Sequence, residues 1–176
     1  MLWFDTEPEE AARFYVSVFP NSKVTAVSFY GDGAPRPKGA VMVVAFELDG
    51  QPFTALNAGP QFKFTEAISL VINCEDQAAV DHYWDRLTSD GGKAAACGWL
   101  KDRYGLCWQV IPAEVFEMLA DADRDRAARA HSAVMQMVKL DLAQIRRAAC
   151  GETIGRGGLC HGQRVRQLGR SVTMTA

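Results

Sequence analysis

The chain contains an internal repeat with an offset of 68 residues, and this repeat constrains the fold more than any other feature of the sequence. With that offset, residues 2–7 align without a gap on residues 70–75, so that an apolar run precedes an acidic residue in both segments. The apolar positions of the helical stretch that follows also coincide, namely Ala11 with Ala79, Tyr15 with Tyr83 and Phe19 with Leu87. Repetition of a strand and a helix indicates two copies of one supersecondary unit.

The first copy of the repeat predicts the element order β-α-β-β-β. Thr6, with Glu9 three residues later, predicts a capping box at the start of the helix, and Pro20 ends that helix. Asp49-Gly50 is typical of the tight turn of a hairpin. Alternation and apolar content place the strands at residues 2–5, 23–30, 40–48 and 51–57.

The second copy predicts the same order, with strands at 66–73 and 93–96, a helix at 75–89 and a hairpin at 97–112. A strand that starts near Glu66 corresponds to a position before Met1. We therefore expect the first strand of the chain to be short, or the chain to begin late.

The hairpin loop is expected at residues 102–105, because Gly105 supplies the positive φ that a short loop needs. This register pairs Lys101 with Leu106, Trp99 with Trp108, Leu100 with Cys107 and Gly98 with Gln109. The Trp pair would stabilise the sheet, and Pro112 would end the strand because proline has no N–H for the ladder. Cys97 and Cys107 would then point to opposite faces and form no disulfide.

The sequence predicts three segments. Residues 1–112 form one domain of two modules, 1–58 and 66–112, and residues 113–150 form C-terminal helices packed on that domain or at a dimer interface. Those helices are expected at 114–119, 123–137 and 141–149. Residues 151–176 are rich in Gly and Arg without apolar periodicity, which predicts a disordered tail that could bind an anionic partner.

The composition argues against several classes of protein. The net charge of −2 disfavours general nucleic-acid binding. No apolar run is long enough for a membrane span, and no signal peptide is expected. Five cysteines without a CxxC spacing predict reduced thiols in a cytoplasmic protein.

Several short segments carry a family resemblance within residues 1–149. They are Leu2-Trp3-Phe4-Asp5, Glu10-Ala11-Ala12, Phe14-Tyr15, Phe19-Pro20-Asn21-Ser22, Glu47-Leu48-Asp49-Gly50, Phe62-Lys63-Phe64, Glu66-Ala67-Ile68-Ser69 and Cys97-Gly98-Trp99-Leu100-Lys101-Asp102. With the paired modules, they resemble the vicinal oxygen chelate superfamily of glyoxalase I, extradiol dioxygenases and bleomycin-resistance proteins. Within it, the chain is similar to the PhnB-like family, often labelled 3-demethylubiquinone-9 3-methyltransferase. The resemblance implies an α+β, glyoxalase-like fold: paired βαβββ modules forming a curved mixed sheet, with a helical C-terminal extension.

The resemblance also implies four positions for metal ligands, on the first and last strands of each module. On the last strands, counting from the turn glycines Gly105 and Gly50 gives Gln109 and Thr54. On the first strands, the positions are Ser69 and, 68 residues earlier, Met1. These side chains suit a divalent ion poorly, and the three histidines (82, 131 and 161) lie on predicted helices and in the tail. We therefore expect neither a metal nor a cofactor.

A ligand site is expected on the open face of the sheet. The polar candidates are Gln109, Thr54, Ser69 and Asn57, and the aromatic candidates are Phe62, Phe64, Trp99 and Trp108. For each, a purely structural role in the core or a dimer interface is the alternative. Strand alternation allows only one of Trp108 and Gln109 to line the site.

Three functions are compatible with this sequence. The first is binding of a small apolar molecule without metal, since Cys97 and Lys101 are too far apart along the strand for a catalytic dyad. The second is an enzyme of the superfamily with a degenerate metal site. The third is the methyltransferase of the label, although Gly31-Asp32-Gly33 leads into a strand and not into the helix of a nucleotide-binding motif. We also expect a homodimer, because relatives with two modules in one chain commonly pair.

Overall fold

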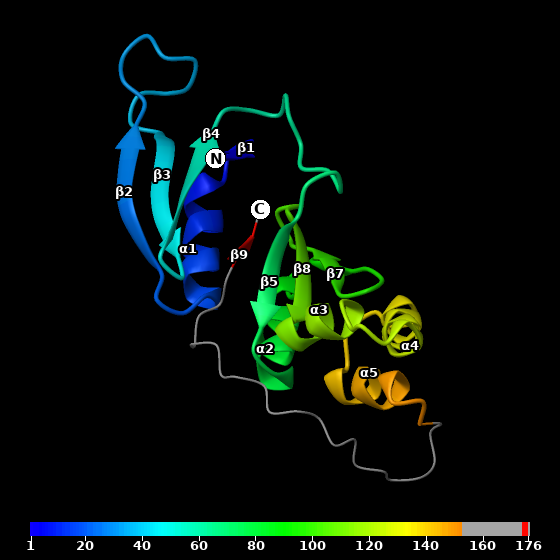
Figure 1. Ribbon diagram of the computed structural model, residues 1–176. Coiled ribbons are helices and arrows are strands. Elements are labelled where there is room, and N and C mark those ends of the chain that lie inside the picture. The colour runs from blue at the N-terminus through cyan, green and yellow to red at the C-terminus, as the bar shows by residue number, and fades with distance from the viewer. Residues whose placement is uncertain (153–173, 176) are drawn as a thin grey trace. The chain divides into compact units, whose positions relative to one another are not determined.

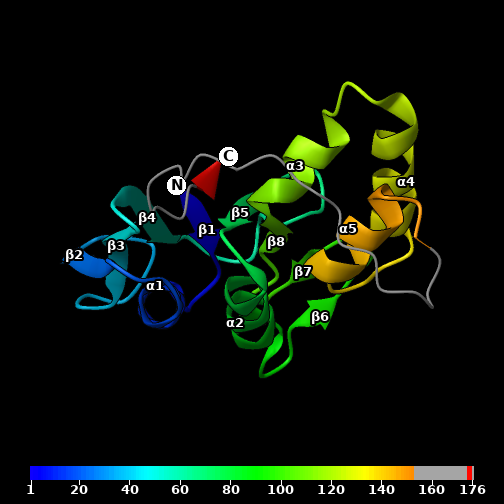
Figure 2. The same cartoon turned by 60° about the horizontal axis from the view of Figure 1, so that its bottom comes forward.

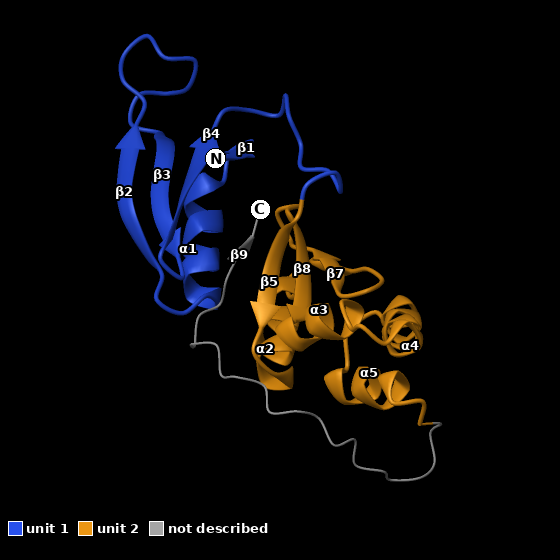
Figure 3. Cartoon of the chain, viewed as in Figure 1, with its two compact units in different colours: residues 1–68 blue, residues 69–176 orange. Residues whose placement is uncertain are grey.

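The computed structural model describes residues 1–152 and 174–175, and the chain divides into two compact units. Unit 1 spans Met1–Ile68 and unit 2 spans Ser69–Ala176, as Figure 3 shows. Each unit contains one copy of the repeat, so the structure confirms an α+β fold of paired βαβββ modules. The expectation of a disordered tail falls on residues outside those that the structure describes, except for 151, 152, 174 and 175.

Unit 1 is a four-stranded mixed sheet in the order β1-β4-β3-β2, and Figure 2 views its helix almost end-on beside the strands. β1 is parallel to β4, and the other neighbours are antiparallel. The Asp49-Gly50 hairpin forms as predicted, with Leu48 opposite Gln51. Its elements are β1 (Leu2–Phe4), α1 (Pro8–Val18), β2 (Lys23–Phe29), β3 (Val41–Leu48) and β4 (Gln51–Asn57).

The start of α1 differs from the predicted capping box at Thr6 and Glu9. The helix begins at Pro8, and the preceding Glu7 makes no side-chain cap. Glu9 instead forms an ion pair with Arg13 one turn later, and the carboxylate of Glu7 accepts the Thr6 hydroxyl. Proline starts the helix because its fixed φ suits the first helical position and its missing N–H would have had no partner there.

Unit 2 repeats this order in a five-stranded sheet, β6-β7-β8-β5-β9. β5 is parallel to β8, as β1 is to β4, and the two residues of β9 add an antiparallel edge that composition did not indicate. Its elements are β5 (Leu70–Cys74), α2 (Gln77–Thr88), β6 (Lys93–Ala94), β7 (Trp99–Lys101), β8 (Cys107–Pro112), α3 (Ala113–Leu119), α4 (Arg124–Met135), α5 (Leu142–Ala149) and β9 (Met174–Thr175).

The first strand of unit 2 is shorter than the predicted 66–73. The backbone N–H of Ile68 donates to the carbonyl of Thr65, so the start of that apolar run forms a turn. β5 therefore begins at Leu70, which the offset of 68 aligns with Leu2, the first residue of β1. The two first strands thus begin at equivalent positions, and β1 is short as expected, with three residues against five in β5.

The register of the β7–β8 hairpin is shifted by one residue from the prediction. Trp99 lies opposite Gln109 and not opposite Trp108, and Cys107 lies opposite Lys101 and not opposite Leu100. The loop is longer than expected because the backbone N–H of Asp102 donates to the carbonyl of Leu106, which draws Leu106 out of the strand. The predicted end of the strand at Pro112 is confirmed.

The three C-terminal helices of unit 2 build a second apolar core beyond the end of β8. Ile111 of β8 joins it, together with Val115, Met118, Ala130, Val134, Leu140, Leu142, Ile145 and Ala149. α4 is shorter at both ends than the predicted helix 123–137, because Asp123 is its N-cap and the helix ends at Met135. Within the described residues, no helix has both the length and the apolar character that a bilayer crossing requires.

The described cysteines agree only in part with the expectation of reduced thiols. Cys74, Cys97 and Cys107 are free. Cys97 lies in the turn before β7, with a φ of +59°, so strand alternation does not assign it to a face of the hairpin. Cys150 takes part in a disulfide, which neither the number nor the spacing of the cysteines indicated.

Candidate functional site

The sheet of unit 2 has one face covered by α2, and its other face is covered in part by the C-terminal helices, whose core includes Ile111 and contacts Val71. Trp108 and Val110 of β8 point toward α2 and are fully buried. Because side chains alternate along a strand, Gln109 points to the other face. Trp99 and Val71 lie directly opposite Gln109 on the neighbouring strands, and all three are half-buried. We call this surface the Gln109 face, defined by Ser69, Val71, Trp99, Lys101 and Gln109.

A side-chain hydrogen bond fixes the amide of Gln109 on this face. Its Nε2 donates to Oγ of Ser69 over 2.8 Å, from the centre of β8 to the residue that precedes β5. Among the described residues, none donates a hydrogen bond to Oε1 of Gln109, and Ser69 keeps its hydroxyl proton for another acceptor. The pair can therefore offer a ligand one acceptor and one donor beside the Trp99 ring.

The equivalent face of unit 1 carries no such amide. Trp3 lies opposite Leu56, and Val71 lies opposite Gln109, so the repeat makes Leu56 the counterpart of Gln109. The predicted counterpart, Thr54, is two residues away on the same face. The prediction placed Thr54 and Gln109 at the same distance in sequence after the turn glycine of their hairpins. The hairpin of unit 1 has a two-residue turn, however, and that of unit 2 has a longer loop, so equal distances do not lead to equivalent positions.

Two of the aromatic candidates gather around β1. Phe62 meets the ring of Trp3 edge-on at 4.9 Å between centroids and is itself 65% exposed. Phe64 packs edge-on against the buried Phe4 at 5.4 Å, which is a structural contact. Both lie in unit 1, and neither belongs to the Gln109 face.

Asn57 and Trp108 are in the protein interior. Asn57 is 7% exposed, and its Nδ2 donates to the backbone carbonyl of Val41 over 2.8 Å, while its Oδ1 accepts no hydrogen bond within the described part of the chain. Trp108 is fully buried, and its indole N–H donates to the carboxylate of Asp102 over 2.8 Å. Their contacts are those of structural residues, so we do not include them in the candidate site.

The expected metal-ligand positions do not supply a suitable donor set. They hold the neutral oxygens of Gln109 and Ser69 in unit 2, and Leu56 occupies the position equivalent to Gln109 in unit 1. Hard divalent ions prefer carboxylates, and zinc prefers imidazole or thiolate. No group of three or more His, Cys, Asp or Glu residues comes together in the parts of the chain that the structure describes. The residues therefore do not fit the metal that the superfamily resemblance implies.

The Gln109 face also lacks a group suited to acid–base or nucleophilic chemistry. The residues that the strand register places on it include no carboxylate and no imidazole. Cys107 shares the face but is 2% exposed. Cys74 lies on the opposite side of the sheet, where burial, followed by the negative charge of Asp76, raises the pKa of its thiol to about 12. A thiol in that state is protonated at neutral pH and is a poor nucleophile. This arrangement can hold and orient a molecule but offers no evident base.

Two features of this region have no counterpart in the sequence-based prediction. Asp102 was expected to be an ordinary loop residue, but it is 3% exposed and accepts three hydrogen bonds. An Asp that opens a turn followed by Gly is a common side-chain-to-backbone motif, so this part of its role was accessible from sequence. Lys93 lies directly opposite Lys101, a pairing that only the correct strand register reveals.

Two βαβββ modules, each with its first strand parallel to its last, define a protein of the glyoxalase-like α+β class. Within this class, the chain belongs to the family described as 3-demethylubiquinone-9 3-methyltransferase, whose model matches residues 1–111. A search of curated proteins found no significant match to the chain.

Two solved structures agree with this assignment. The PhnB protein of Bacillus cereus, which carries the same methyltransferase label in provisional form, is 33% identical with a TM-score of 0.58. The match covers 64% of this chain and 95% of that one. Protein PA1353 of Pseudomonas aeruginosa is 21% identical with a TM-score of 0.52, over 62% of this chain and 91% of its own, and supports the fold alone.

Proposed function

We propose that this protein binds a small, largely apolar molecule on the Gln109 face of unit 2 without the help of a metal ion. Small-molecule sites are mostly apolar with a few placed polar groups. This face combines the half-buried Trp99 with one amide–hydroxyl pair, beside Val71, which packs against the core of the C-terminal helices. The observation that carries the proposal is the 2.8 Å hydrogen bond from Gln109 to Ser69, which holds a polar amide in one orientation on a half-buried sheet face.

The test is a screen of small aromatic and alicyclic molecules against the full chain, followed by Gln109→Leu. NMR detects binding through the Trp99 indole and the Gln109 side-chain amide. Loss of one ligand hydrogen bond is expected to weaken binding about fivefold, because such a bond contributes about 1 kcal/mol. Gln61→Leu, on an exposed loop of unit 1, is the matched control and is expected to leave affinity unchanged. A ligand whose affinity is the same for Gln109→Leu would contradict the proposal.

The family label favours methyl transfer as a second candidate. Against it, the Gly31–Gly33 loop is followed by β3, whereas a methyl donor such as S-adenosylmethionine is usually held by a Gly-rich turn that leads from a strand into a helix. Calorimetric titration with S-adenosylmethionine is expected to give no saturable heat. Saturable binding would favour the methyltransferase over the passive binder.

The remaining alternative is an enzyme of the vicinal oxygen chelate type with a degenerate metal site. Elemental analysis of protein purified without chelator or affinity tag separates this alternative from the first proposal. We expect far less than one zinc, iron, nickel or manganese ion per chain. A near-stoichiometric ion that Gln109→Leu releases would establish the degenerate metal site.

A further inference from the structure

Two sulfur atoms from distant parts of the chain meet at the C-terminal end of α4. The thiol of Cys97, in the turn before β7, donates to Sδ of Met135, the last residue of α4, over 3.6 Å. The backbone N–H of Cys97 also donates to the carbonyl of Met137 over 2.7 Å, and the next residue along each segment pairs in the same way, from Gly98 to Val138 over 2.8 Å. These backbone hydrogen bonds hold the two segments together, so the fold itself keeps the sulfurs close.

The separation of the two sulfurs suits a shared metal ion. Two sulfur ligands of one tetrahedral ion, with bonds of about 2.3 Å, lie about 3.8 Å apart. Because the thiol of Cys97 donates to Sδ of Met135, a cation that replaces the thiol proton would contact both sulfurs. Thiolate and thioether are soft ligands and favour Cu(I), whereas hard divalent ions prefer oxygen.

Solvent reaches this sulfur pair. Met135 is 56% exposed, and Cys97 is only partly buried. The other free thiols in the described part of the chain, those of Cys74 and Cys107, are 0% and 2% exposed. Cys97 is therefore the one of these three thiols that an ion from solution can approach without opening the core.

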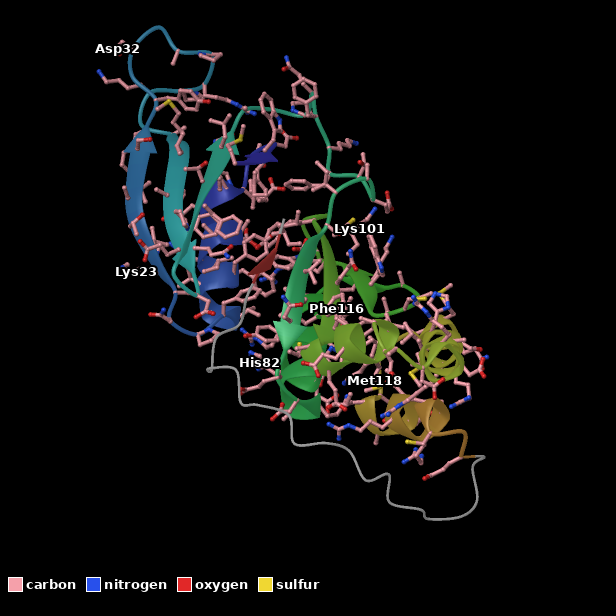
Figure 4. The ribbon with its side chains drawn as sticks, viewed as in Figure 1. Lys23, Asp32, His82, Lys101, Phe116 and Met118 are labelled. Atoms are coloured by element: carbon pink, nitrogen blue, oxygen red, sulfur yellow. The ribbon has the colours of Figure 1, made fainter. Side chains whose placement is uncertain are left out.

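An imidazole and a helix end lie beside the pair. His131 is exposed and precedes Met135 by four residues on α4, so the two side chains emerge on the same side of the helix. The other histidine that the structure describes, His82, belongs to α2, and Figure 4 shows it apart from α4. The last carbonyl groups of a helix carry partial negative charge, which favours a cation at this end of α4.

We propose that Cys97, Met135 and His131 form a binding site for a soft monovalent metal ion, of which Cu(I) is the biological example. On binding, the S–H bond of Cys97 breaks, its proton passes to water, and the thiolate bonds to the ion with no change of oxidation state. The site goes beyond the proposed function, since none of its three residues belongs to the Gln109 face. It also differs from the metal site that the superfamily resemblance implies, because none of them is at the four expected positions.

The experiment titrates the full chain, purified without an affinity tag, with Ag⁺ as a redox-inert probe of soft monovalent ions. We expect calorimetry in chloride-free buffer to show one tightly bound ion per chain. In NMR spectra, the methyl signal of Met135 is expected to shift. Met118, which is 6% exposed in the core of the C-terminal helices, is expected to keep its methyl signal.

Three variants remove the donors one at a time: Cys97→Ser, Met135→Leu and His131→Ala. Each is expected to weaken Ag⁺ binding about tenfold or more, since the loss of a residue that merely supports a metal ligand already costs that much. Met135→Leu conserves the side-chain volume, so its thermal unfolding is expected to match the wild type. Met118→Leu is the matched control and is expected to keep the full affinity.

Unchanged Ag⁺ affinity in Met135→Leu or His131→Ala would show that Cys97 binds the ion as an ordinary thiol, and would overturn the inference. Binding that leaves the Met135 methyl signal unmoved would overturn it as well, and so would the absence of saturable binding. None of these results bears on the proposed function, because the titration does not involve the ligand of the Gln109 face.

Discussion

The indole N–H of Trp108 donates to Oδ2 of Asp102 across the base of the β7–β8 loop, over 2.8 Å. The other oxygen of that carboxylate accepts the backbone N–H groups of Tyr104 and Leu106. Asp102 and Trp108 are both buried, so all three donors depend on one carboxylate. This contact fixes the loop length, and with it the register that brings Trp99 opposite Gln109.

Asp102→Ala is expected to lower the free energy of unfolding by about 3 kcal/mol, because buried donors lose a charged acceptor. Urea unfolding measures the change. A double-mutant cycle with Trp108→Phe isolates the indole contact, for which we expect a coupling of about 1.5 kcal/mol. Asp32→Ala, on an exposed loop, is the control. Loss of less than 1 kcal/mol on Asp102→Ala would show that the loop does not depend on this carboxylate.

Gly98 is expected to tolerate no side chain. Its φ is +79°, and an added Cβ would lie 2.9 Å from the carbonyl oxygen of Val110 and 3.1 Å from Leu140. The sequence-based register instead placed Gly98 directly opposite Gln109. Gly98→Ala should cost about 2 kcal/mol or more, from backbone strain and overpacking together. Gly105→Ala is the matched control, since its φ is +87° with nothing within 4 Å. Equal losses in both variants would mean that packing at Gly98 contributes nothing.

Acid is expected to destabilise the start of α5. The pKa of Asp141 lies below the ordinary value because its carboxylate accepts the backbone N–H of Gln144, as the N-cap of the helix. A lowered folded-state pKa gives stability that is complete above about pH 4 and is lost as pH falls through the folded pKa. Asp141→Asn keeps a capping oxygen but does not titrate. We therefore expect its unfolding free energy to fall less than that of the wild type between about pH 5 and pH 3, and an identical fall would contradict this account.

Alkylation should distinguish the free thiols of Cys74, Cys97 and Cys107. The pKa of Cys74 is raised to about 12 by burial, so about one molecule in ten thousand carries the thiolate at pH 8. Cys107 is 2% exposed, whereas Cys97 is only partly buried, with its thiol donating to the sulfur of Met135. Iodoacetamide labelling with peptide mass spectrometry should therefore modify Cys97 before Cys74 and Cys107. Modification of Cys74 first would be inconsistent with its burial in the folded protein.

We propose that the protein is a homodimer joined through its C-terminal helices. Met135 at the end of α4 is 56% exposed and Phe116 on α3 is 45% exposed, and large apolar side chains on a surface favour association. Sedimentation at micromolar concentration should give a dimer, and Met135→Glu should shift it toward monomer, while Ala143→Glu on α5 should not. A monomeric wild type would contradict the proposal.

The sequence by itself determined the kind and order of the elements in both modules. Apolar residues at helical spacing, such as Ala11 and Tyr15, specify α1 because burying one stripe of a helix needs only local periodicity. Asp49-Gly50 specifies its hairpin because positive φ at a two-residue turn admits few other residues. The offset of 68 residues predicted that both modules share one topology, and the strand orders agree.

Only the tertiary structure decided which residues meet. Whether Trp99 faces Trp108 or Gln109 depends on a one-residue shift, which the burial of Asp102 determines and which no strand periodicity reveals. The same shift moved Gly98 away from the position opposite Gln109. The different hairpin loop lengths made Leu56, not Thr54, the counterpart of Gln109. The juxtaposition of Lys93 with Lys101 likewise follows from register. The reason is that side-chain alternation fixes a face only once the pairing is known, and pairing is set by contacts between residues distant in the sequence.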